Sequence, residues 1–240
     1  MTIRNIERGN IIKSFHLNGN VLKWIAILTM LIDHIGAVIL EKGLAQNSPF
    51  YNRLDIVLRL IGRVAFPIFC FLLVEGFLHT HNFKRYLFSL IAFSALSEVP
   101  FDLAVFGKLD INHQNVYFTL WLGLLTIYMI DRMEKRAGKY LILQKAACIL
   151  AGALAAFALH TDYGAAGVLL ICILYMTRKN RMEQCLLGAV CLIEEITSVF
   201  AFLLIYFYDG TRKKGINRYF FYFFYPVHLL LLYGVYLLIQ

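Results

Sequence analysis

The feature that most constrains this chain is a series of long apolar runs, separated by short segments that hold most of the charges. Each run approaches the ~20 residues that a helix needs to cross ~30 Å of hydrocarbon. Inside lipid, backbone N–H and C=O groups must be bonded within their own segment, so such runs form helices. With 60% hydrophobic residues among 240, the chain has too little polar surface for a water-soluble domain. We therefore expect an all-α, polytopic integral membrane bundle.

We predict about eight or nine transmembrane helices within a single domain, residues 1–240. The expected spans are residues 22–40, 56–78, 86–106, 115–131, 140–159, 164–177, 183–194, 196–208 and 219–238. Residues 183–208 fit either one long helix or two short half-spans that turn at Glu194 and Glu195. We prefer the hairpin because it leaves the basic segment 212–218 on the cytoplasmic side.

The distribution of basic residues predicts the orientation. Loops 79–86, 132–139, 178–182 and 209–218 carry clustered Lys and Arg, whereas the intervening loops hold scattered ones such as Lys42, Arg53 and Lys108. Cytoplasmic loops are the basic ones, so the N-terminus is expected in the cytoplasm. Arg4, Arg8 and Lys13 precede a first span that reads as retained and not as a signal peptide. Topology thus explains the net charge of +8, and no nucleic-acid partner is expected.

The cysteines indicate no metal site and no disulfide framework. All five lie singly inside apolar segments, and neither a CxxC pair nor a Cys/His ligand spacing is present. We interpret them as small core residues.

Ionisable residues inside the expected spans need a reason, because each costs at least ~2.5 kcal/mol on insertion scales. Such residues are numerous for a chain of this size, and together they predict a polar cavity inside the bundle. They are Asp33, His34, Arg59, Arg63, Glu75, Glu98, Asp102 and His228.

Two of these pairs share a helix face. Arg59 and Arg63 are four residues apart, and so are Glu98 and Asp102, which flank the helix-breaking Pro100. One interpretation is that the two pairs neutralise each other as buried salt bridges. The other is that the arginines hold an external anion such as a phosphate, which suits their forked donors.

Asp33 and His34 form the most suggestive pair. As neighbours on a helix they point about 100° apart, so the carboxylate is not automatically the partner that orients the imidazole. That partner must come from another helix, or the helix must unwind near Gly36. We predict that His34 is catalytic, as a general base.

Other polar candidates lie near span ends. The aromatic run at 219–229 fits an interfacial belt, yet it also places Tyr225, Pro226 and His228 inside the last span. Asn115 stands at an expected helix start, where it can cap that helix. Asp162 and Tyr163, in a short outer loop, are similarly ambiguous.

Several segments together resemble the TraX family, which is named for acetylating the N-terminus of a conjugative pilin subunit. The resemblance runs in order over nearly the whole chain. It rests on LKWIAILTMLIDHIG (22–36), IGRVAFPIFCFLLVEGFLHT (61–80), SEVPFDL (97–103), QNVYFTLWLG (114–123), DYGAAGVLL (162–170) and FYPVHLLLL (224–232). The family is also distantly similar to the membrane acyltransferases, among them the bacterial type-three acyltransferases and the lysosomal heparan N-acetyltransferase.

Type-three acyltransferases typically carry L-R-G-I-A and an essential His eleven residues after the Arg. Here Lys23 takes the place of the Arg, and His34 follows it by eleven residues. The resemblance therefore gives the catalytic role to His34. Glu75 stands where those proteins have the Ser of S-G-F, and Pro226 with His228 resembles their last-span signature.

The resemblance implies an acetyltransferase in a bacterial plasma membrane that uses acetyl-CoA and no metal. His34 would be the base, helped by Asp33 if the local helix geometry permits. The residues expected at the donor or substrate are Lys23, Arg59, Arg63, Glu75, Glu98, Asp102, Asn115, Tyr225 and His228. Its partners would be acetyl-CoA, the lipid bilayer and an acceptor whose identity the sequence does not give. The oligomeric state also cannot be inferred from the sequence. The alternatives are a small transporter that uses the intramembrane charges, or a non-catalytic assembly factor.

Overall fold

The computed structural model describes residues 16–44, 48–193, 195–211 and 217–239, and every regular element in these ranges is helical. Two isolated β-bridges join Leu17 to Tyr208 and Gln114 to Thr161. The elements are α2 (Gly19–Ile35), the π-helix η1 (Gly36–Leu44), α3 (Pro49–Gly62), α4 (Ala65–His79), α5 (Phe83–Phe106), α6 (Val116–Arg136), α7 (Leu141–Ala158), α8 (Gly164–Met176), α9 (Arg181–Cys191), the 3-10 turn η3 (Ile196–Ser198), α10 (Val199–Tyr206) and α11 (Arg218–Ile239).

Among the described residues, six stretches are long and apolar enough to cross a membrane, by length and composition. They are α2 with η1, α3 with α4, and α5, α6, α7 and α11; α8 is a shorter apolar helix. The expected all-α membrane bundle is confirmed, whereas a count of eight or nine spans is not. The basic residues expected before the first span, Arg4, Arg8 and Lys13, lie outside the described residues.

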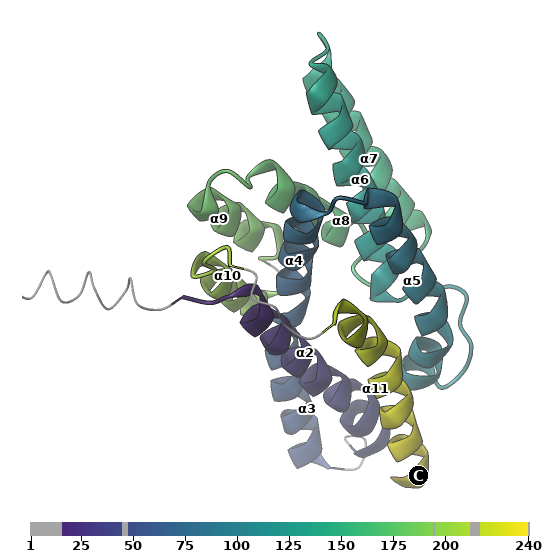
Figure 1. Ribbon diagram of the computed structural model, residues 1–240. Helices are drawn as coiled ribbons and strands as arrows, with labels where there is room; N and C mark the ends of the chain where they lie inside the picture. Colours follow the sequence, from purple (N-terminus) through teal and green to yellow (C-terminus); the bar gives the residue numbers. More distant parts are fainter. Residues whose placement is uncertain (1–15, 45–47, 194, 212–216, 240) are drawn as a thin grey trace, which may run out of the picture.

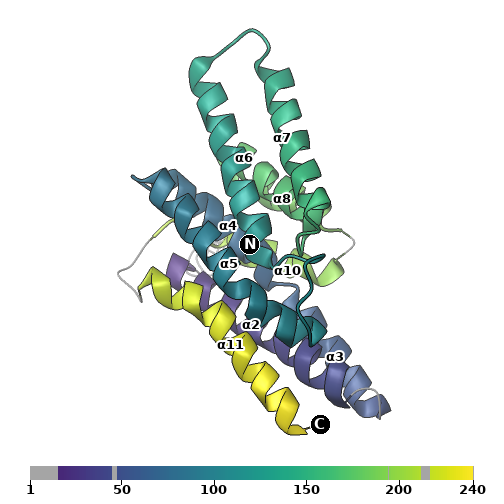
Figure 2. The same cartoon turned by 90° about the vertical axis from the view of Figure 1, so that its right-hand side faces the viewer.

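The helices form two connected groups (Figures 1 and 2). α6 and α7 make a long antiparallel hairpin that extends away from the rest, and α8 packs against both. In the other group α2 packs on α3 and α4, while α11 lies along α5. A continuous core of buried apolar side chains, centred on α4, α6 and α8, joins the groups.

Residues 183–208 do not form one long helix in the part of them that is described. α9 ends at Cys191 and α10 begins at Val199, and the two short helices pack against each other. At ~1.5 Å rise per residue neither is long enough to cross the hydrocarbon core alone. The predicted turn falls between them, although Glu194 itself lies outside the described residues.

Prolines inside two helices do not end them. α5 continues through Pro100 and α11 through Pro226. A proline leaves the carbonyl four residues earlier without its helical N–H donor. In α11 that carbonyl belongs to Tyr222, and the hydroxyl of Tyr117 on α6 donates to it at 3.1 Å. The irregularity in α11 is therefore satisfied by a neighbouring helix, as membrane proteins require.

Candidate functional site

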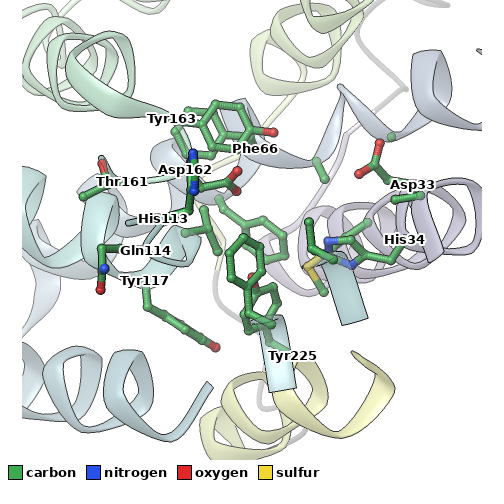
Figure 3. A pocket seen from close by; sticks show the side chains of 18 of the residues that line it. Asp33, His34, Phe66, His113, Gln114, Tyr117, Thr161, Asp162, Tyr163 and Tyr225 are labelled. Carbon is green, nitrogen blue, oxygen red and sulfur yellow. The ribbon is translucent and has the colours of Figure 1, made fainter. Parts of the chain in front are cut away.

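A cavity of about 360 Å³ lies between α2, α3, α4, α5, α6 and α11, and the loops that follow α5 and α7 line one end of it. Figure 3 shows its interior: the side chains of Asp33 and His34 come from one side, and Asp162 points in from the other. We call it the outer cavity, since it lies at the end predicted to face away from the cytoplasm. Of the predicted site residues, it collects Asp33, His34, Arg59, Arg63 and Tyr225.

The imidazole of His34 pairs with a second histidine, His228 on α11. Nδ1 of His34 lies 2.7 Å from Nε2 of His228, and Nδ1 of His228 lies 2.7 Å from the carbonyl oxygen of Phe224. Residues 194 positions apart thus meet within the bundle. His228 is 4% exposed, whereas His34 is half-buried because its ring borders the cavity.

This chain of contacts fixes the tautomer of both neutral rings. A carbonyl oxygen only accepts hydrogen bonds, so Nδ1 of His228 carries the proton and its Nε2 is an acceptor. Nδ1 of His34 must therefore donate to it, which leaves Nε2 of His34 with a free lone pair. An imidazole held in this tautomer is equipped to act as a general base or nucleophile.

Asp33 takes no part in that pair. Its carboxylate accepts from the guanidinium of Arg59 on α3 at 2.5 Å. The expectation that the partner of His34 comes from another helix therefore holds, and the residue is His228, while Asp33 has its own cationic partner.

Two glycines allow this close approach of α2 and α3. A Cβ on Gly62 would collide with the side chain of Asp33, and one on Gly36 would lie 2.9 Å from a carboxylate oxygen of Asp55. The π-helix η1 begins at Gly36, two residues after His34. π-helical turns are rare and are frequently found at functional sites.

Arg63, at the end of α3, is also paired. Its guanidinium lies 3.2 Å from a carboxylate oxygen of Glu195. The two arginines thus reach Asp33 and Glu195, and not Glu98 and Asp102 as the mutual-neutralisation interpretation supposed. Both arginines are about one-third exposed, toward the cavity that they line.

The loop between α7 and α8 completes the cavity wall. The backbone N–H of Asp162 donates to the carbonyl of Gln114 at 2.9 Å, and that of Gln114 to the carbonyl of His160 at 3.1 Å. This bridge ties two loops together across the opening. The side chain of Asp162 lines the cavity and is itself exposed. Desolvation by the surrounding protein atoms and the nearby carboxylate of Asp33 raise the pKa of Asp162 to about 6, against the opposing effect of the two arginines.

Lys23 and Glu75 lie elsewhere, on a second cavity of about 550 Å³ near the start of α2 and the end of α4. Lys23 places its ammonium 5.3 Å from the ring centre of Phe221. These two residues are therefore separated from His34, and they share no wall with Asp33.

Glu98, Asp102 and Asn115 line neither cavity. The side-chain amide of Asn115 donates to Glu98, and the carboxylate of Asp102 accepts the backbone N–H of Asp110 at 2.9 Å. Asn115 also caps α6 by accepting the N–H of Tyr117 at 3.0 Å, as predicted. These three residues hold the α5–α6 loop in place, and with it one wall of the outer cavity.

Several residues at the site had no decisive signal in the sequence. His113 and His160 lie in the loops that follow α5 and α7, with their ring centres 6.4 Å apart. Glu195, which pairs with Arg63 but does not itself line the cavity, lies in the break between α9 and η3. A histidine or carboxylate in a polar loop is ordinary, so only its approach to the intramembrane charges marks it as part of the site.

Comparison with known proteins identifies the family. The model of the family described as TraX protein matches residues 18–236. The chain belongs to the TraX family. The predicted resemblance is thereby confirmed over most of the sequence.

A curated relative supports this assignment. The chain is 32% identical to a probable fimbrial assembly protein FimC, serogroup H1, of Dichelobacter nodosus, over 88% of this chain and 92% of the relative. No solved structure matches the chain. The site in this TraX-family chain is therefore inferred from the geometry of this structure alone.

Proposed function

We propose that this TraX-family chain is a membrane-bound acetyltransferase that moves an acetyl group from acetyl-CoA to an amine or hydroxyl of an acceptor. The observation that carries the proposal is the histidine pair, which leaves Nε2 of His34 unprotonated at the wall of a polar cavity inside a helical bundle. Acyl transfer from a thioester needs a base near neutral pH, and a neutral imidazole meets that need.

In the proposed reaction Nε2 of His34 removes the proton from the acceptor N–H or O–H. The acceptor atom attacks the thioester carbonyl, a C–N or C–O bond forms, and the C–S bond breaks. The departing thiolate then takes the proton from the imidazolium, so the base is regenerated. In a two-step version Nε2 itself attacks the thioester carbonyl, the C–S bond breaks and the thiolate departs. The acceptor atom then attacks the acetyl-histidine, the bond between Nε2 and the acetyl carbon breaks, and the proton of the acceptor passes to the thiolate.

The charged wall of the outer cavity suits the same chemistry. Arg59 and Arg63 border the space in front of His34 and would stabilise negative charge on the thioester oxygen in the transition state. His228 acts as the positioning residue, because it holds the productive tautomer of His34. Asp33 was expected to help His34, but it pairs with Arg59 instead. Its proposed role is therefore to position the guanidinium of Arg59 and not the imidazole of His34.

The acceptor to test first is the amino terminus of a pilin-like subunit. The relative from Dichelobacter nodosus is named as a fimbrial assembly protein, and the TraX resemblance points to pilin acetylation. The proposed location is a bacterial plasma membrane, with the N-terminus in the cytoplasm as the basic loops predict.

The direct test is thiol release from acetyl-CoA by detergent-purified protein, with a peptide that carries a free pilin-type amino terminus. We expect acceptor-dependent release by the unaltered chain and a rate about 10²–10⁴-fold lower by His34→Gln. His16→Gln is the matched control, since His16 is exposed and lines neither cavity. Equal turnover by His34→Gln would contradict the assignment of the base.

A transporter is the second candidate, because the two cavities meet inside the bundle at shared wall residues. A transporter would move its substrate without consuming acetyl-CoA. Folded protein that neither binds nor cleaves the thioester at millimolar concentration would favour transport over the enzyme.

A further inference from the structure

An amine acceptor has two protons to lose, and the base described above accounts for one of them. At neutral pH an α-amino group, with a pKa of ~8, is mostly in its ammonium form. It must lose one proton before its nitrogen can attack, and a second proton as the amide bond forms. Nε2 of His34 has a single lone pair and takes a single proton. If the proposed function holds for an amine, a second proton acceptor must face the same cavity.

The loop that carries Asp162 is anchored on both sides of that residue. Before it, the hydroxyl of Thr161 lies 2.9 Å from the hydroxyl of Thr119 on α6. After it, the ring of Tyr163 stacks on that of Phe66 on α4, with ring centres 3.4 Å apart. The backbone of Asp162 is therefore held in place against two helices of the bundle.

The carboxylate of Asp162 is left open, in contrast to that of Asp110 in the neighbouring loop. Asp110 accepts from the backbone N–H of Asn112 and from the ring of His113, each at 3.0 Å. No hydrogen bond or salt bridge holds the Asp162 carboxylate within the part of the chain that the structure describes. It points into the outer cavity from the wall opposite His34 (Figure 3). A fixed backbone with an open side chain suits a group that meets a ligand.

Two other carboxylates line the outer cavity among the described residues, and each is less suited to this role. Asp33 already accepts from the guanidinium of Arg59 at 2.5 Å, so one of its oxygens is occupied. Glu41 lies on η1, seven residues beyond His34 on the same helical segment, and not on the facing wall. An acceptor placed between the two walls would therefore meet the carboxylate of Asp162.

We propose that Asp162 is a second proton acceptor of this site, which takes one proton from an ammonium acceptor before Nε2 of His34 takes the other. In the first step an N–H bond of the ammonium breaks, its electron pair stays on the nitrogen, and the proton passes to a carboxylate oxygen. The neutral amine then attacks the thioester, and its second proton goes to His34 and on to the departing thiolate. The side chain of Asp162 is exposed, so its proton passes to water and the carboxylate is restored.

The surroundings of Asp162 suit this exchange. Its pKa, raised to about 6, leaves the carboxylate ionised at neutral pH and brings its basicity closer to that of an amine than an ordinary carboxylate has. The titratable and charged groups around it are Asp33, Arg59, Arg63, Glu195, Tyr163 and Tyr225, with His113 and His160 at the same end of the cavity. The arginines keep their charge throughout the pH range in which enzymes are assayed.

The proposal makes Asp162 specific for charged acceptors. A hydroxyl has one proton to lose as it attacks, and so has an amine that is already neutral. Both need His34 alone. Asp162 is therefore required only where the acceptor arrives as an ammonium.

The test compares Asp162→Asn with the unaltered full chain in detergent, using acetyl-CoA and a peptide with a free amino terminus. At about pH 6.5, where the amine is an ammonium, kcat should fall by about tenfold or more. At about pH 9, where the amine is mostly neutral, the difference should shrink to about twofold or less. The replacement removes no hydrogen bond of the carboxylate, so the fold should be kept, and a melting curve checks this.

A second acceptor and two further variants sharpen the test. An aromatic amine is neutral at neutral pH, so Asp162→Asn should acetylate it as fast as the unaltered protein does. Asp162→Glu keeps a carboxylate and should restore part of the rate with the peptide. Glu41→Gln is the matched control, because it removes a different carboxylate from the same wall and should keep the pH profile of the unaltered protein.

The outcomes separate this proposal from the proposed function. A loss that is equal at both pH values, or equal for the two acceptors, would indicate a structural role and overturn the proposal. A raised KM with unchanged kcat would also overturn it, since Asp162 would then bind the ammonium without taking its proton. In each of these cases the acetyltransferase stands. If the unaltered protein transfers acetyl to neither acceptor, the proposed function itself fails.

Discussion

Charged side chains cluster at both ends of α6, but at one end they pair with each other and at the other end they face a cavity. At its C-terminal end Glu134 accepts from Lys145 at 2.6 Å and from Arg178 at 3.0 Å. At its N-terminal end α6 borders the outer cavity, where the ring of His34 and the carboxylate of Asp162 face open space. The comparison teaches that a polar side chain that faces a cavity is available for chemistry, whereas a charged side chain that is held between partners of opposite charge contributes to stability.

The largest expected effect falls on His34. Replacing it with Gln removes the only lone pair aimed at the outer cavity from the histidine pair, so turnover should fall by about 10²–10⁴-fold. The measurement is acetyl transfer per folded protein, with thermal stability as the check on folding. If the His34→Gln variant turned over as fast as the unaltered protein, His34 would not be the base, and the cavity end of α6 would not differ in function from the ion-paired end.

His228 should have the next largest effect, because it acts through His34. His228→Ala loses the acceptor for Nδ1 of His34, and turnover should fall by about tenfold. His228→Gln can return an acceptor oxygen near the former position of Nε2, so partial rescue is expected. A merely structural role would instead lower stability in proportion to activity, with no rescue by Gln.

Glu134 should affect stability without affecting catalysis. Glu134→Gln weakens two partly exposed ion pairs, with an expected cost of about 1 kcal/mol in the free energy of unfolding. Turnover of the folded protein should stay unchanged. Glu183→Gln is the control, since Glu183 is exposed in the first turn of α9. A large loss of turnover would show that this end of α6 also serves the reaction.

Asp162 should give the smallest effect on stability, visible as pH dependence. Its pKa is raised from 3.8 to about 6 in the fold, so between these values the folded chain binds more protons than the unfolded one. Stability therefore falls as the pH rises from about 4 to 6. Asp162→Asn should lack this part of the profile and melt at a higher temperature than wild type at pH 7.5. An equal dependence of the melting temperature on pH in both proteins would mean that the surroundings of Asp162 do not raise its pKa.

Much of the site could be predicted from residue type alone. Ionisable residues are costly in lipid, so their presence inside a span indicates a site. This applies to the Asp-His pair in the middle of one span, the two arginines on one helix face and the histidine in the last span. The roles of Glu98, Asp102 and Asn115 could not be inferred in the same way. Their polar character is equally suited to binding a ligand and to holding a loop, and only their contacts distinguish the two.

The number of membrane spans is another property that the sequence predicts only in part. Hydropathy finds apolar runs, but α8, α9 and α10 are short, and an apolar run of that length does not show whether it crosses or turns back. Lipid is as apolar as a protein core, so the pattern also gives little information on which face of a helix meets its neighbours.

The sequence by itself determined that this is a helical membrane protein with polar groups inside, because the cost of charge and of unbonded backbone in lipid leaves few alternatives. Only the tertiary structure decided which of those groups meet. Asp33 and His34 are neighbours in the chain yet take separate partners, Arg59 and His228, because adjacent residues on a helix point in different directions. Which helix stands in each direction depends on packing across the whole bundle, and that packing sets the tautomer of His34.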